Sequence, residues 1–179
     1  MTIKAIETVY NGYRFRSRLE ARWAVYFDAL NIQYQYEMQG FELGPLGRYL
    51  PDFYLTKYRI YVEVKPEMPS GIELAKILAF GKEHSIVIAD AQPDLRWYHS
   101  NYCFEMYSDD GLQINQGYYP YCEQCYSFYE HKSGRIWLRL GSENLEYIGE
   151  QSDFQNAVLS ARQARFEHGE YPRIYKGVS

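Results

Sequence analysis

The spacing of apolar residues over the first ninety positions is the feature that most limits what this chain can fold into. A helical spacing without Gly or Pro predicts a helix over residues 18–31, with Ser17 as its N-cap. The apolar stripe of this helix consists of Leu19, Trp23, Ala24, Phe27 and Leu30. Beyond residue 31 the apolar spacing changes to a period of two, which is typical of strands.

Three strands are predicted after this helix, over residues 34–37, 49–55 and 58–64. A second helical pattern follows over residues 72–84, and the short apolar run at 85–90 is expected to be a central strand of a sheet. The order is therefore helix, three strands, helix, strand, which favours the α/β class.

The composition is that of a globular protein, with 46% hydrophobic and 23% charged residues. The sequence contains no run of eighteen apolar residues, and its first residues lack the pattern of a signal peptide, so neither a membrane span nor secretion is expected. Three cysteines are too few for a secreted disulfide scaffold. We therefore expect a reducing compartment, the cytoplasm.

Charge is distributed unevenly along the chain. A net charge of -4 argues against a protein that simply coats nucleic acid. Residues 1–65 contain nine Lys/Arg and seven Asp/Glu, whereas residues 66–179 contain ten and sixteen. The arginines of the first part are concentrated at Arg14, Arg16, Arg18 and Arg22. This segment is the more suitable place for an anionic ligand, although a solvated helix face would carry the same residues.

Two carboxylates and a lysine form the pattern that points to chemistry. Pro51-Asp52 lies in one predicted strand, and Glu63-Val64-Lys65 follows ten residues later in the next. Glu63 and Lys65 are two residues apart and share a face of their strand, where Asp52 can meet them. Carboxylate oxygens bind Mg²⁺, a bound metal activates water, and a lysine stabilises charge on a phosphoryl group. The alternative interpretation is a pair of ordinary polar positions on a half-exposed strand.

This pattern resembles the motif of the PD-(D/E)xK nuclease superfamily. The helix that begins near Phe15-Arg16-Ser17-Arg18-Leu19-Glu20 is also similar to one in phage and bacterial members related to the transposon-end and very-short-patch-repair endonucleases. The resemblance covers roughly residues 10–92, and it implies that the cytoplasm is that of a bacterial or phage-infected host cell. It implies a restriction-endonuclease-like core, with a mixed central sheet flanked by helices in αβββαβ order. It also implies that Asp52, Glu63 and Lys65 are catalytic.

Glu20 matches the first-helix glutamate that completes the metal site in many members of this superfamily. The resemblance therefore implies that Asp52, Glu63 and Glu20 bind Mg²⁺ or Mn²⁺. From the residues alone, Glu20 could equally pair with Arg16 one helical turn earlier. Arg16, Arg18 and Arg22 are the candidate nucleic-acid-binding residues.

The domain organisation predicted from these patterns has three parts: a nuclease-like core over 1–92, a Tyr- and Cys-rich β insert or subdomain over 93–150, and a C-terminal helix and tail over 151–179. The insert contains one clear strand at 136–140, and the last helix is expected over 152–167 with Ser152 as its cap.

The insert carries a C-x-x-C pair that suggests half of a structural zinc site. Its candidate ligands are Cys122, Cys125, Cys103 and His131. Because a second C-x-x-C is absent, buried thiols without zinc explain the pair equally well. The nearby aromatic run from Tyr118 to Tyr129 fits the core of a small β subdomain better than a surface that stacks on bases.

The function predicted from the sequence is a Mg²⁺-dependent endonuclease that hydrolyses phosphodiester bonds, with DNA favoured over RNA as the substrate. No membrane partner is expected, and the sequence is compatible with a homodimer. Two alternatives stay open. One is a catalytically silent module on a nuclease scaffold that binds nucleic acid or protein, such as a phage counter-defence protein. The other is an RNA-directed nuclease.

Overall fold

The structure is a computed structural model that describes residues 5–93, 102–105, 113–116, 126–130, 135–140, 144–167 and 170–175. Within these ranges the chain combines three α-helices with mixed and antiparallel sheets, so the α/β class predicted from the sequence is confirmed. The helices are α1 (Arg18–Ala29), α2 (Gly71–Gly81) and α3 (Gln151–Arg162).

The centre of the fold is a four-stranded mixed sheet with the order β3-β6-β7-β8. Its strands are β3 (Tyr34–Tyr36), β6 (Phe53–Leu55), β7 (Ile60–Lys65) and β8 (Ile86–Asp90). The first three strands pair antiparallel, whereas β7 and β8 run parallel because α2 makes the crossover between them. The predicted order of these helices and strands is confirmed, but β8 lies at the end of the strand order instead of at its centre.

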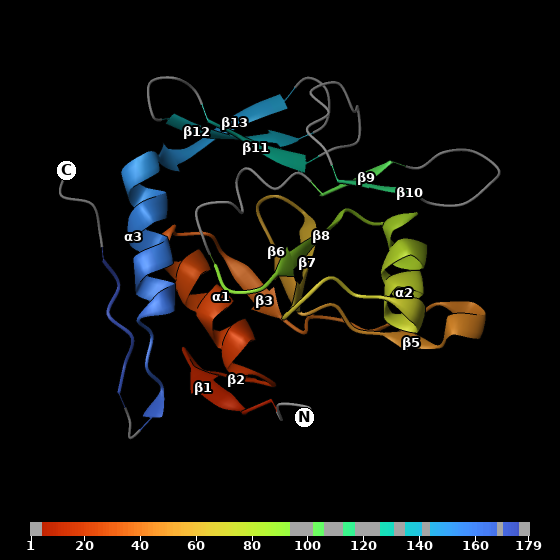
Figure 1. The fold of residues 1–179 in the computed structure, drawn as a ribbon, viewed down its shortest axis with the longest axis horizontal. Helices are drawn as coiled ribbons and strands as arrows, with labels where there is room; N and C mark the ends of the chain where they lie inside the picture. Colours follow the sequence, from red (N-terminus) through yellow and green to blue (C-terminus); the bar gives the residue numbers. More distant parts are fainter. Residues whose placement is uncertain are drawn as a thin grey trace.

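Helices cover both faces of this sheet (Figure 1). On one face α1 and α3 lie side by side, and Trp23 and Phe154 belong to the same buried cluster as Val62 of β7. On the other face α2 packs Phe80 against Tyr61 of β7, with ring centroids 5.0 Å apart. None of the helices in the described ranges has the length and apolar character needed to cross a bilayer.

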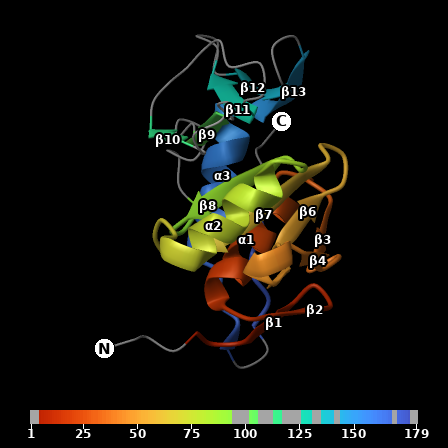
Figure 2. The same ribbon diagram turned by 90° about the vertical axis from the view of Figure 1, so that its right-hand side faces the viewer.

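Smaller β elements surround this core. β1 (Thr8–Tyr10) pairs with β2 (Tyr13–Phe15), and β4 (Phe41–Glu42) pairs with β5 (Arg48–Tyr49) around the 3₁₀ turn η1 (Gly44–Leu46). Further along the chain are the pair β9 (Tyr102–Glu105) and β10 (Gln113–Gln116) and the three-stranded sheet of β11 (Tyr126–Glu130), β12 (Arg135–Leu140) and β13 (Asn144–Glu150). In Figure 2 the three-stranded sheet lies beyond one end of α3, and the β1–β2 hairpin lies at the opposite end of the molecule.

Two predicted elements differ from the structure. The strand expected over 49–55 is divided into β5 and β6, because Pro51 cannot donate to a strand ladder and the Asp52 side chain bonds to the backbone of β7. The last helix ends at Arg162, and Ser152 is not its N-cap. Glu150 takes that position and forms a capping box with Asp153.

Candidate active site

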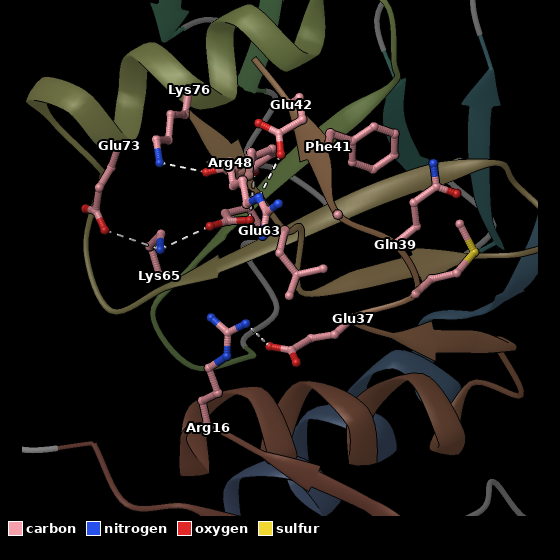
Figure 3. A pocket seen from close by; sticks show the side chains of 14 residues that line it. Arg16, Glu37, Gln39, Phe41, Glu42, Arg48, Glu63, Lys65, Glu73 and Lys76 are labelled. Atoms are coloured by element: carbon pink, nitrogen blue, oxygen red, sulfur yellow. Dashed lines mark hydrogen bonds and ion pairs between the residues drawn. The ribbon is translucent and has the colours of Figure 1, made fainter. Parts of the chain in front are cut away.

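Alternation along β7 places Glu63 and Lys65 on the face of the sheet that α2 covers. The odd-numbered Tyr61 packs against α2, whereas Val62 and Val64 enter the cluster beneath α1. Glu63 is 5% exposed, and its Oε1 lies 3.0 Å from Nζ of Lys65. Lys65 also contacts Glu73 of α2 at 3.5 Å (Figure 3). The glutamate and lysine of the sequence motif are therefore in direct contact.

Asp52 occupies the bend between β5 and β6 and is 7% exposed. Its Oδ2 accepts a hydrogen bond from the Val64 amide at 2.7 Å, which ties the bend to the end of β7. Burial raises the pKa of Asp52 well above its usual range, and the negative charges of Glu63 and Glu20 raise it further. The Val64 N–H and the charge of Lys65 oppose this shift only in part. The structure thus brings Asp52, Glu63 and Lys65 within electrostatic reach of one another.

Tyr49 is a site residue that the sequence analysis did not identify. Its hydroxyl donates to Oε2 of Glu63 at 2.8 Å, so Glu63 is held by Tyr49 on one oxygen and by Lys65 on the other. Burial and then the charge of Glu63 raise the pKa of Tyr49 far above its usual value, so the hydroxyl keeps its proton. The sequence contains only a general indication of this bond. A buried glutamate needs a hydrogen-bond donor, and Tyr49 lies two residues before Pro51, close to Asp52 of the motif.

Glu20 is buried at the start of α1, where both of its carboxylate oxygens accept hydrogen bonds. Ser17 Oγ donates to its Oε1 at 2.6 Å, and its Oε2 accepts from Tyr36 Oη at 2.5 Å and from the Arg16 amide at 3.1 Å. Ser17 Oγ also accepts from the Glu20 amide at 3.1 Å and so acts as the predicted N-cap. The contact with Arg16 involves its backbone and not its guanidinium. Glu20 therefore contributes negative charge near Asp52 while both of its oxygens are hydrogen-bonded.

A cleft of about 810 Å³ opens beside Glu63 and Lys65 (Figure 3). Its walls include Tyr49 and, besides Lys65, three further cations and three further acids: Arg16, Arg48, Lys76, Glu37, Glu42 and Glu73. Lys76 of α2 and Glu37, the residue after β3, both line this cleft. The space beside the motif is therefore highly polar.

The three predicted nucleic-acid-binding arginines do not lie together. Arg16 lines the cleft and forms an ion pair with Glu37. Arg18 forms an ion pair with Glu167 and is not part of the cleft wall. Arg22 is also absent from the wall, and its buried Nε has no hydrogen-bond partner among the described residues. Only Arg16 is placed beside Glu63 and Lys65.

Two buried carboxylates, those of Asp52 and Glu63, are the candidate oxygen ligands for Mg²⁺. In the part of the chain that the structure describes, no three His, Cys, Asp or Glu side chains form a group that could hold a metal ion as they stand. Mg²⁺ usually keeps several waters and is held by one or two carboxylates together with substrate phosphates. Asp52 and Glu63 are two buried carboxylates on adjacent segments, and they fit that requirement.

The predicted zinc ligands Cys122, Cys125 and His131 lie outside the described residues. Cys103 lies in β9, and its side chain is outside them too. The same holds for the side chains of the aromatic run from Tyr118 to Tyr129.

Comparison of the chain with protein-family models, with curated proteins and with solved structures finds no match.

Proposed function

We propose that this protein is a Mg²⁺-dependent nuclease that hydrolyses phosphodiester bonds in DNA, and that its core is the restriction-endonuclease-like fold of the PD-(D/E)xK superfamily. The observation that carries the proposal is the convergence of buried Asp52 and Glu63 with Lys65, of which Glu63 and Lys65 line a polar cleft. The element order of α1, the central sheet and α2 supports the fold assignment.

The electrostatics of the site favour a cation ligand. Asp52 and Glu63 are both more than nine-tenths buried, and their mutual repulsion contributes to the raised pKa of Asp52. Lys65 is the cation in direct contact with Glu63, and it is shared with Glu73. Buried carboxylates without full compensation are costly, so a divalent ion between Asp52 and Glu63 would offset their charge. Glu20 adds negative charge to this region, and both of its oxygens, like those of Glu63, have partners in the chain.

The chain's own residues have separable roles in such a reaction. Desolvation lowers the pKa of Lys65, but Glu63, Asp52 and Glu73 outweigh it, so the pKa is raised and the lysine stays protonated at neutral pH. Lys65 therefore acts as a donor that orients water or a phosphoryl oxygen, and not as a general base. Tyr49 fixes the orientation of Glu63. The chemistry that a bound Mg²⁺ supplies is water activation and neutralisation of charge on the phosphoryl group.

Cleavage of plasmid and oligonucleotide DNA in Mg²⁺ or Mn²⁺ against EDTA tests the proposal. We expect wild type to cut only with metal, and Asp52→Asn and Glu63→Gln to lose at least about 100-fold in rate. Glu83→Gln is the matched control, because Glu83 is exposed beyond α2 and outside the cleft. Equal cleavage by Asp52→Asn and wild type, with circular dichroism showing both folded, would contradict the proposal.

A non-catalytic nucleic-acid-binding protein is the second candidate. It is favoured by the existing hydrogen bonds of the acids, since Val64 occupies Oδ2 of Asp52 and three donors occupy Glu20. Metal-independent binding of DNA or RNA without any cleavage would support this candidate.

Zinc in the insert is a separate prediction, which an elemental zinc measurement tests.

A further inference from the structure

We propose that the phosphate backbone of a nucleic acid lies along the cleft between Arg16 on one wall and Arg48 with Lys76 on the other. Arg48 and Lys76 then supply phosphate contacts that the sequence pattern had assigned to Arg18 and Arg22. The identity of the ligand rests on the proposed function, whereas the position of the binding surface rests on the cleft itself.

Three separate parts of the chain bring cations to this one space. Arg16 precedes α1, Arg48 belongs to β5, and Lys76 lies on α2. All three line the cleft that also contains Glu63 and Lys65 (Figure 3). A backbone that entered this cleft would place its phosphates beside the proposed reaction centre and between positive side chains on both walls.

The two cleft arginines are accessible, and Arg48 is only weakly held. The side chain of Arg48 is 89% exposed and that of Arg16 is 57% exposed, and each forms an ion pair, with Glu42 and Glu37 respectively. The Arg48–Glu42 pair is exposed on both sides, and such pairs contribute only about 0–1 kcal/mol, whereas Glu37 in the other pair is 25% exposed. The Arg48 guanidinium can therefore exchange its carboxylate for a phosphate, which a guanidinium binds through two parallel hydrogen bonds.

The positive charge of Lys76 is not neutralised by its hydrogen-bond acceptor, the Arg48 carbonyl. Its Nζ donates at 2.7 Å to the backbone carbonyl of Arg48, which is a neutral acceptor. This hydrogen bond holds the ammonium group against β5. Since Nζ has no second partner among the described residues, two of its three N–H donors can bind a ligand. Arg48 and Lys76 together thus form a positive wall opposite Arg16.

The acids of the cleft set the strength of binding. Glu37, Glu42, Glu63 and Glu73 line the same space as the four cations. Attraction to a polyanion should consequently be modest and strongly dependent on salt, and it should increase with divalent cations. The whole chain has a net charge of -4, so local placement of Arg48 and Lys76 matters more than overall charge.

Fluorescence anisotropy with a labelled DNA duplex and an RNA duplex of the same sequence tests this inference. The full chain is used in EDTA, where the proposed hydrolysis does not occur, at about 50 mM salt and upward. R48Q and K76Q remove cleft cations. R14Q and R18Q are matched controls, because each removes one charge from an ion-paired arginine outside the cleft.

We expect R48Q and K76Q each to weaken binding roughly 5–10-fold and to reduce the salt slope by about one, with little effect of the controls. Whichever duplex binds more tightly identifies the source of the phosphates. Equal losses in all four variants, no loss in R48Q and K76Q, or no binding of either duplex would overturn the inference. If R48Q and K76Q weaken binding more than the controls but the wild type cleaves nothing, this inference stands and the nuclease proposal is contradicted. If the wild type cleaves DNA but the four variants bind alike, the nuclease proposal stands and this inference is contradicted.

Discussion

At the scale of single residues, and within the described part of the chain, tyrosine hydroxyls bond to two of the three buried acids, Glu20 and Glu63, and to half-buried Asp28. Three acidic side chains accept such bonds, from Tyr36 to Glu20, from Tyr49 to Glu63 and from Tyr10 to Asp28. A tyrosine buries a large ring and also supplies a donor, so it can fill a core and satisfy a carboxylate at once. This arrangement accounts for part of the high tyrosine content, 20 of 179 residues.

Tyr49→Phe is expected to impair the site without unfolding the protein. The change removes the 2.8 Å hydrogen bond to Glu63 and leaves Oε2 buried without that donor. Loss of a residue that orients a metal ligand typically costs 10–100-fold in metal affinity or activity. Cleavage rates measured across a Mn²⁺ titration should therefore show a higher metal requirement. Tyr54→Phe, on β6 beside Tyr61, is the matched control, and equal behaviour of the two variants would exclude this role for Tyr49.

Asp52→Asn is expected to stabilise the metal-free protein at neutral and alkaline pH. Because burial and neighbouring acids raise the pKa of Asp52 in the folded state, folding favours its protonated form. That contribution is complete below the unfolded pKa of about 3.9 and is lost as pH rises through the folded pKa. Asparagine avoids the loss and still offers an oxygen to the Val64 amide.

Thermal unfolding in EDTA from pH 5 to pH 8 measures this effect. We expect the variant to gain at least about 1 kcal/mol over wild type at pH 8, or about 2–4 °C in Tm, and the difference to shrink toward pH 5. Added Mn²⁺ should raise the Tm of wild type but not of Asp52→Asn. A variant that is less stable than wild type at pH 8 would disprove the expectation.

At the scale of elements, strand β7 links the core to the site. Its even-numbered valines enter the cluster beneath α1, and its odd-numbered residues run from Tyr61 beneath α2 to Glu63 and Lys65 at the cleft. Helix α3 completes the α1 side of this core. Phe154 is fully buried and lies edge-on to Tyr26 with ring centroids 6.5 Å apart.

Phe154→Ala tests how much the α1–α3 contact contributes to stability. Removal of a buried phenylalanine side chain typically costs about 3–5 kcal/mol, so the urea midpoint should fall sharply. Leu159→Ala on the same helix is the control, because Leu159 is 39% exposed and its truncation should cost less than about 1 kcal/mol. Similar losses for the two variants would mean that α3 does not stabilise the core through its buried face.

At the scale of the whole molecule, the two ends of the described chain build one core. Residues of α3, which follows the β-rich region, share a buried cluster with α1, β6 and β7. Arg162 at the end of α3 also donates from Nε to the Pro93 carbonyl at 3.2 Å. The segment between residues 93 and 150 is thus inserted between two parts that pack together.

A shortened chain tests this arrangement. Pro93 contacts the end of α3 through Arg162, so the start of α3 lies one helix length away. A helix of 12 residues is about 18 Å long, a distance that a Gly/Ser linker of about 12 residues spans. Replacement of residues 94–149 by such a linker should preserve a cooperative urea transition. A chain that ends at Pro93 lacks α3 and should show no such transition. The same transition in both chains would indicate that the core is complete without α3.

Local pattern was sufficient to predict much of this fold. The apolar stripe from Leu19 to Leu30 predicted α1 and its Ser17 cap, because helix spacing and capping depend on neighbouring residues. The break at Pro51 and the cap at Glu150 were missed, since both depend on which backbone groups bond to side chains. The edge position of β8 was missed because strand order depends on contacts between segments distant in sequence.

That Glu63 and Lys65 share a strand face could be predicted from residue spacing alone, because side chains alternate along any strand. The surroundings of these two residues are a property of the tertiary structure. The bond from Tyr49 to Glu63, the wall of Arg48 and Lys76 and the absence of Arg18 from the cleft follow from how β5, α2 and α1 pack. Those contacts join residues that are far apart in the chain, and no local spacing rule encodes them.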